Sequence, residues 1–421
     1  MRPLRLTQLF AALLLPPLLL AAQSANEPLT WEEGVRQATA VNPDLRAARD
    51  SLQAAEMNVN GAGSGFFPQI SGNVARTDGT SSSTTSNVPT TSSALVVNQN
   101  LFAGFGDQAS VAQARANRAA AEANLRAARA KVSYDLKTAF ATLRYATNDR
   151  SLSADIVRRR EQNLRLVELR FESGRENKGS LLLSQATLSQ ARLGLLQADQ
   201  ALPVAQAQLA RVLARDDPQV LSLVGTVPTS APPAQVDFMR AVLDTPDQQR
   251  ALAQVEAAKA GVDIAASGFW PSLDLTGTAN RMSSDTAPDY RSNSVILSLT
   301  VPIFSGGKTY YGTRSAGAQE SAAEAQREGL LRQLRTQLEQ AYAVYVLAVT
   351  QLTVAEEFRK AAQVRAEIAR NKYSNGLMSF EDWDIIENDL IGRERTLLLS
   401  QRDRITAEAA WEQALGTGVI P

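Results

Sequence analysis

The sequence has 421 residues with 43 basic and 43 acidic side chains, and this balance gives no general attraction to nucleic acid. It contains no cysteine and no histidine, which excludes disulfides, thiolate or imidazole metal sites and every catalytic mechanism that needs either residue. Aromatic residues make up only 6% of the chain, a composition that favours long helices over a compact aromatic core.

Residues 1–25 have the pattern of a secretory signal peptide. Arg2 and Arg5 precede an apolar run from about Leu9 to Leu20, and small residues follow. A membrane anchor is the alternative, but the run is short and contains two prolines, whereas a helical span needs ~20 apolar residues. The pattern therefore predicts an exported chain.

The next elements form a first repeat, residues 26–226. Thr30 and Glu33 have the spacing of a capping box, which predicts a helix start, and Asn42-Pro43 predicts a bend. Alternating residues predict a β-hairpin at about 69–101 around a polar loop at 77–93. A long helix at about 107–170 and a return helix at about 178–215 complete the repeat.

Residues 227–235, VPTSAPPAQ, have the composition of a linker. The second repeat, residues 236–421, again predicts a helix, a β-hairpin at about 272–302 with a polar loop at 281–292, and two further helices. These are a long helix at about 309–373 and a return helix at about 379–416. Each long helix corresponds to a rod of roughly 95 Å.

Matched segments in the same order support this duplication of about 200 residues. The pairs lie 203 residues apart at first and 202 later: NPDLRAA (42–48) with TPDQQRA (245–251), SGFFPQI (64–70) with SGFWPSL (267–273), LFAGFG (101–106) with IFSGGK (303–308), and RFESG (170–174) with KYSNG (372–376). This period is far longer than that of a solenoid repeat, so each half is a sizeable unit.

The helices carry heptad seams that predict coiled-coil packing. One seam comprises Leu188, Ala191, Leu195, Ala198, Leu202, Ala205, Leu209 and Val212; another comprises Leu334, Leu338, Ala341, Tyr345, Ala348, Leu352 and Ala355; a third comprises Ala112, Ala116, Ala119, Ala123, Ala127 and Ala130. Pro203 lies within the first seam and predicts a bend or a loosened turn there.

Two interpretations of the hairpins are open from the strands alone: soluble hairpins packed on helices, or part of a transmembrane β-barrel. Export and the long polar loops favour the barrel. Four strands are fewer than the eight of a small barrel, so several copies must contribute, and three copies supply twelve.

With these features, the sequence resembles the TolC-like outer membrane efflux protein family, also called outer membrane factors. The similar segments are LTWEEGVRQATAVNPDL (29–45), the FFP and FWP corners, the LFAGFG and IFSGGK turns, and the RFESG and KYSNG turns. The resemblance implies an α+β membrane protein that forms a homotrimer, with a 12-stranded barrel in outer-membrane lipid and a coiled-coil periplasmic tunnel. It also implies a periplasmic adaptor, an inner-membrane pump of unknown class, and export of drugs, small molecules or proteins from a Gram-negative cell.

The resemblance also assigns candidate site residues. The helix-to-barrel corners are Phe66, Phe67, Pro68, Phe269, Trp270 and Pro271, and the adaptor-docking tip turns contain Phe171, Gly174, Asn177, Tyr373, Gly376 and Ser379. Glycine in these turns permits a tight reversal, so ordinary helix hairpins explain them equally well.

Acidic residues cluster just after the second tip turn, in SFEDWDIIEND (379–389). A favourable helix N-terminus explains part of this cluster. The alternative is a periplasmic aperture in which Glu381, Asp382, Asp384 and Glu387 of three copies form an acidic constriction. The resemblance places one aperture aspartate at Asp382 and a second at position 385, where this chain has isoleucine.

The sequence features bear on three function classes. A passive export duct explains the duplicated hairpins and the lack of any nucleotide-binding motif. The hypothesis of an exported coiled-coil structural protein accounts only for the heptads. The hypothesis of an enzyme is not supported, because the sequence shows no catalytic constellation. We therefore expect no enzyme activity and no cofactor. The basic run Arg158, Arg159 and Arg160 is expected to lie on a solvated helix face or to pair with acids on other helices.

Overall fold

The computed structural model describes residues 28–78, 89–217, 221–284 and 288–421. The signal peptide predicted at residues 1–25 lies outside them, as does the middle of the first polar loop. Within the described ranges, none of the helices combines the length and the apolar character that a membrane-spanning helix requires.

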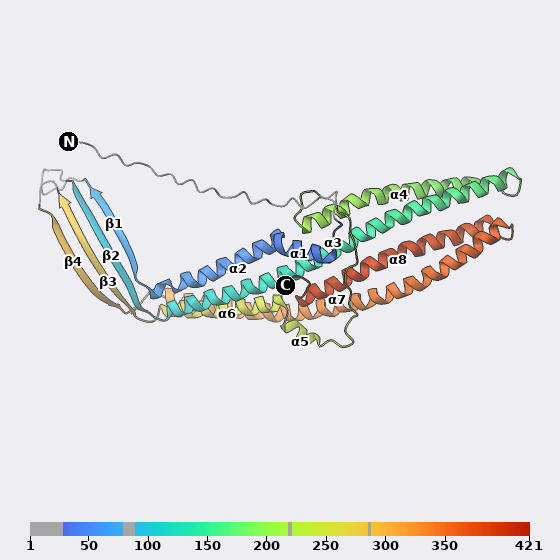
Figure 1. The fold of residues 1–421 in the computed structure, drawn as a ribbon. Helices are drawn as coiled ribbons and strands as arrows, with labels where there is room; N and C mark the ends of the chain where they lie inside the picture. Colours follow the sequence, from blue (N-terminus) through green and yellow to red (C-terminus); the bar gives the residue numbers. More distant parts are fainter. Residues whose placement is uncertain (1–27, 79–88, 218–220, 285–287) are drawn as a thin grey trace, which may run out of the picture.

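The chain forms an elongated molecule with a β-sheet at one end and two long helical hairpins pointing away from it (Figure 1). The first half contains α1 (Trp31–Val41), α2 (Pro43–Ala62), the 3-10 helix η1 (Gly63–Phe66), β1 (Gln69–Thr77), β2 (Thr90–Ala103), α3 (Gly106–Glu172) and α4 (Lys178–Val212). The second half contains α5 (Phe238–Leu243), α6 (Pro246–Ser267), β3 (Ser272–Ser284), β4 (Tyr290–Thr300), α7 (Lys308–Ser374) and α8 (Phe380–Leu415). Both α3 and α7 have 67 residues, which corresponds to roughly 100 Å each, as the sequence predicts.

Local signals explain where the shorter helices begin. Asn42 and Thr245 each cap a helix whose first residue is proline, and their side chains accept hydrogen bonds from backbone amides of the first turn. Thr30 likewise accepts from the amide of Glu33 at 3.3 Å. The reciprocal half of the predicted capping box is wrong, because the Glu33 carboxylate pairs with the Arg36 guanidinium instead.

The four strands form one antiparallel sheet in the order β1-β2-β3-β4. The second and third strands have 14 and 13 residues, because both extend into the segments that the sequence assigned to polar loops. Residues 90–93 and 281–284, which the sequence assigned to loops, belong to strands because they pair directly with each other. Polar Thr and Ser side chains do not prevent this pairing, since the ladder uses only backbone groups.

The largest buried cluster lies in the middle of the rod, and a smaller one lies at the tips. Trp31 and Phe140 meet edge to face with ring centroids 5.5 Å apart, and they join α1 to α3. A second cluster around Tyr345 and Trp411 joins α7, α8 and α5. The sheet, by contrast, has no buried residue in any described strand of the single chain.

The α4 seam is confirmed, since six of its eight predicted positions are buried; they are Leu188, Ala191, Ala198, Ala205, Leu209 and Val212. In α3 the prediction is half right: Ala116, Ala123 and Ala130 are buried, but Ala112 and Ala119 are exposed. The reason is that this part of α3 contacts α6 and α2 as well, through Gln113 and Arg118. The helix α4 continues through Pro203 to Val212.

Candidate functional site

The two tip turns lie at the end of the molecule farthest from the sheet (Figure 1). Gly174 and Gly376 both have positive φ angles, 71° and 76°, a conformation that favours glycine in the turn, as predicted. Each turn is followed by a side-chain cap: Asn177 accepts from the Ser180 amide at 2.9 Å, and Ser379 accepts from the Asp382 amide at 3.1 Å. Phe171 is 37% exposed at the first turn.

The tips of the two halves are joined to each other through Tyr373. Its ring stacks on Trp383 with centroids 4.3 Å apart, and the Arg170 guanidinium covers the ring at 4.6 Å. Arg170 also donates to the Tyr373 carbonyl at 2.8 Å, and the Tyr373 hydroxyl donates to Glu176 at 2.9 Å. Tyr373 has no exposed surface, so it holds the two turns together rather than presenting a contact to a partner.

This environment favours the neutral phenol of Tyr373. Burial raises the pKa of Tyr373 well above its usual range, and the hydrogen bond to the Glu176 carboxylate raises it further. In the unfolded chain a tyrosine ionises near pH 10. The folded state therefore gains stability that is fully present below about pH 10 and is lost as the pH rises above it.

We expect Tyr373→Phe to destabilise the tips by about 1.5–3 kcal/mol at neutral pH, because a hydrogen bond to a charged carboxylate is lost. Above about pH 10 the difference from wild type should shrink, since phenylalanine cannot ionise. Urea unfolding at pH 7, 9, 10 and 11 measures both effects. A difference that stays constant over this range would contradict the assigned role of the phenol.

The four acids proposed for the aperture have different environments. Glu381 and Asp382 are exposed, and Asp382 also accepts from the Ser379 hydroxyl at 2.8 Å. Asp384 pairs with Arg160 of α3 at 2.8 Å, and the buried Glu387 pairs with Arg370 of α7 at 2.7 Å. Two of the four charges are therefore compensated within the chain.

Position 385, where the resemblance implies a second aspartate, holds an isoleucine with 65% of its surface exposed. It lies three residues after Asp382 and therefore on the same face of α8. On this face of α8 each chain thus presents the exposed Asp382 carboxylate followed by an exposed apolar side chain. Within the described residues, no group of three or more acidic side chains is placed to hold a metal ion.

The basic run in α3 makes ion pairs, and two of them reach another helix. Arg159 pairs with Glu394 and Arg160 with Asp384, both on α8, whereas Arg158 pairs with Asp155 on its own helix. The sequence left open whether these arginines lie on a solvated face or pair with acids on other helices. The second prediction is confirmed for Arg159 and Arg160. The α3–α8 contact near the tips therefore combines these ion pairs with the apolar cluster of Val167, Phe380 and Trp383.

The two aromatic corners lie between the helices and the sheet. Phe66, Phe67, Phe269 and Trp270 are between 49% and 67% exposed. Pro68 and Pro271 stand directly before β1 and β3, where their fixed φ angle suits the change from helix to strand. Trp270 also meets Phe105 edge to face at 5.8 Å, which fixes the corner against the turn before α3.

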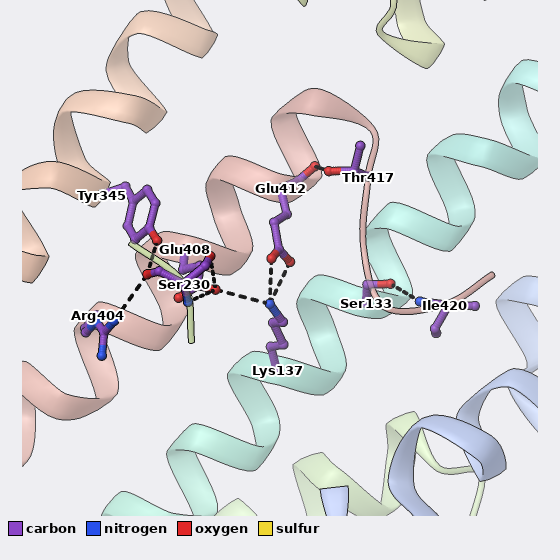
Figure 2. A network of polar contacts seen from close by, with 9 residues as sticks. All are labelled: Ser133, Lys137, Ser230, Tyr345, Arg404, Glu408, Glu412, Thr417 and Ile420. Carbon is purple, nitrogen blue, oxygen red and sulfur yellow. Dashed lines mark hydrogen bonds and ion pairs between the residues drawn. The ribbon is translucent and has the colours of Figure 1, made fainter. Parts of the chain in front are cut away.

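A buried charged network in the middle of the rod was missed by the sequence analysis (Figure 2). Lys137 of α3 contacts both oxygens of Glu412 at 2.7 and 2.8 Å, and its amine is 3.7 Å from Glu408. Glu408 accepts from the amide and hydroxyl of Ser230, each at 3.0 Å. The Ser230 carbonyl in turn accepts from Tyr345 at 2.6 Å and from Arg404 at 3.2 Å.

This network fixes the linker between the halves onto α3, α7 and α8. Lys137 and Glu408 side chains are each only 4% exposed, so their charges depend on one another. A sequence signal does exist: Ala130, Ser133, Lys137 and Phe140 follow helical 3-4-3 spacing and are all buried, so one lysine interrupts an otherwise uncharged stripe. A buried charge is unfavourable unless it is paired, so a lysine in this stripe indicates a buried ion pair.

The fold, with its long helical hairpins and small sheet, is shared with solved outer membrane proteins. It matches the outer membrane protein VceC of Vibrio cholerae with a TM-score of 0.79 and 22% identity over 92% of this chain and 96% of that one. The outer membrane efflux protein BepC of Brucella suis is 24% identical over 96% of this chain and 89% of its own length.

The sequence matches the outer membrane efflux protein family over residues 34–215 and 240–417, and the chain belongs to that family. Its location is accordingly the outer membrane, with a large periplasmic part. The solvent efflux pump outer membrane protein SrpC of Pseudomonas putida is 27% identical over 49% of this chain. That match covers 43% of SrpC, so the chain spans less than half the length of this relative.

Proposed function

We propose that this chain is the passive outer-membrane duct of a tripartite efflux or type I secretion system and works as a homotrimer. The observation that carries the proposal is the four-stranded sheet at one end of two rods of roughly 100 Å. Among the described strands, β1 and β4 have only one neighbour each, so the sheet has two open edges. Joining β1 of one copy to β4 of the next removes these edges, and three copies give twelve strands.

The surface of the sheet supports a lipid environment. Val295, Leu297 and Leu299 alternate along β4 and are 62–79% exposed, and Ile70 and Val74 on β1 are similarly exposed. Alternating apolar side chains that no core covers are typical of the lipid face of an outer-membrane strand. The exposed aromatic corners then lie at the level where such barrels carry aromatic girdles.

Native mass spectrometry of protein extracted from membranes with detergent tests the assembly. A trimer of chains that lack the predicted signal peptide supports the duct. A monomer or dimer that needs no detergent overturns it and favours the alternative, an exported coiled-coil structural protein. Adding the extraction detergent to a soluble sample is the control for detergent-induced association.

The tip turns are proposed to dock the periplasmic adaptor, which connects the duct to an inner-membrane pump. Phe171, Gly174, Asn177, Gly376 and Ser379 form the ends of the two hairpins, and Tyr373 holds these ends together. Their position at the end opposite the sheet supports this role (Figure 1). SrpC belongs to a solvent efflux pump by its name, and small organic molecules are therefore among the candidate cargoes.

The aperture is proposed to lie at Asp382 and Ile385. Three copies give a ring of carboxylates next to a ring of apolar side chains, and the carboxylates favour cations. Asp384 and Glu387 support the ring through their pairs with Arg160 and Arg370 rather than by facing the pore. The carboxylate at Asp382 is the one that the aperture needs.

We expect Asp382→Ala to lower the cation-to-anion permeability ratio several-fold in single-channel recordings across a planar bilayer, because an exposed ring charge is removed. Glu381→Ala is the matched control, since it removes another exposed carboxylate from the neighbouring position, about 100° around the helix. Equal effects of both variants, or no effect of either, would contradict an aperture at Asp382.

A further inference from the structure

A cavity of about 310 Å³ lies where the two halves meet the linker. Its walls come from α3, from residues 226–229 of the linker region, and from α7 and α8. It adjoins the charged network of Figure 2 through Arg404, which lines the cavity and donates to the Ser230 carbonyl. This volume is at the lower end of the range for small-molecule sites.

All charged side chains that line the cavity are positive. Three arginines line it, Arg144 from α3 and Arg402 and Arg404 from α8, and none of the described residues in its wall is acidic. Arg402 does pair with Asp403, but that carboxylate is half exposed and is not among the residues that line the cavity. The cavity itself therefore concentrates positive charge.

The arginines keep donors available. Arg144 donates to the Gly225 carbonyl, and the Arg404 Nε is buried with no hydrogen-bond partner among the described residues. Arg402 is held over the Tyr145 ring at 5.1 Å, which fixes its guanidinium beside the cavity. Each guanidinium has five N–H donors, so the three together have more donors than these contacts use.

The rest of the wall combines apolar and neutral polar side chains. Leu352, Leu398 and Ile405 of the long helices and Val227 of the linker region form its apolar part. The neutral polar side chains are Tyr145, Asn148, Thr226, Thr229 and Gln401. An inorganic anion uses only the arginines, whereas an anion with an apolar body uses both parts of the wall.

We propose that this cavity binds an amphipathic organic anion, with its carboxylate against the arginines and its apolar body against the leucine and isoleucine side chains. Arg144 belongs to the first half and Arg402 and Arg404 to the second, so such a ligand connects the halves beside the linker. The site is separate from the tips and the aperture, and it does not depend on the proposed transport cargo.

The test uses 2-naphthoate as the probe and the purified full chain in detergent, with isothermal titration calorimetry as the readout. We expect saturable binding of one probe per chain with a Kd on the order of 1 mM, the range for a ligand of this size. Inorganic phosphate, as an anion without an apolar body, should bind at least about tenfold more weakly, and 2-naphthamide, as the neutral analogue, should bind equally weakly.

Arg402→Gln and Arg144→Gln should each weaken 2-naphthoate at least about tenfold, since each removes a charged donor pair. Leu398→Trp should weaken it by filling the apolar part while leaving the arginines in place. Arg332→Gln, an exposed arginine elsewhere on α7, should leave the Kd unchanged. Circular dichroism melting of every variant shows that it is folded.

Three results would overturn the proposal. One is the absence of saturable 2-naphthoate binding to the wild-type chain, which includes the case of a neighbouring copy covering the cavity. Another is binding that Arg402→Gln and Leu398→Trp leave intact, because the probe would then sit elsewhere. The third is phosphate that binds as tightly as 2-naphthoate, since the apolar wall would then have no role.

Discussion

Replacing Lys137 with methionine should lower the free energy of unfolding by about 3–5 kcal/mol, the usual cost of removing one partner from a buried ion pair. Lys137 is the cation that contacts Glu412 and lies beside Glu408. Without it, Glu408 keeps only its hydrogen bonds to Ser230, and its Oε2 already has no partner among the described residues. Urea unfolding of the detergent-solubilised chain, followed by circular dichroism, measures the loss.

Lys131→Met is the matched control on the same helix. Lys131 is paired with Asp135 and Asp44, but its side chain is 52% exposed, and such pairs contribute little. The triple variant Lys137→Met, Glu408→Gln, Glu412→Gln should recover part of the loss, because no buried charge is then left unpaired. Equal and small effects of Lys131→Met and Lys137→Met would show that the network does not hold the linker.

The sequence predicts the elements of this chain well because their ends carry local signals. Proline after Asn42 and Thr245 and glycine at positions 174 and 376 mark helix boundaries wherever the rest of the chain lies. Strand ends are less well predicted: Thr and Ser at residues 90–93 look like loop, and they become strand only through pairing with residues 281–284.

The polar contacts are beyond such local reasoning. Lys137 and Glu412 are separated by 275 residues, and Arg160 and Asp384 by 224, so their pairing depends on how α3 packs against α8. Tyr373 illustrates the same limit at the tip. The turn that contains it is evident in KYSNG, but its stacking on Trp383 and its bond to Glu176 of the other hairpin follow only from the fold.

Gly376→Arg should reduce efflux to the level of cells that lack the protein while leaving it in the outer membrane. A Cβ at position 376 meets only the Arg170 guanidinium, at 4.0 Å, so the side chain fits without a backbone clash and projects from the tip. The positive φ of 76° adds about 1–2 kcal/mol of local strain, which a packed hairpin tolerates. The expected loss therefore comes from blocked docking rather than from unfolding, and efflux of a fluorescent dye from intact cells measures it.

Gly225→Arg is the control that separates the effect of blocked docking from the effects of backbone strain and added charge. Gly225 also has a positive φ, 87°, and open space around its Cβ, but it lies between α4 and α5 rather than in a tip turn. It therefore imposes the same kind of backbone strain and the same added charge, and it should leave efflux near the wild-type level. Trimer abundance in the membrane fraction must match for both variants. Wild-type efflux in Gly376→Arg at equal abundance would remove the tip from the docking surface, because an arginine there cannot be accommodated within a close protein contact.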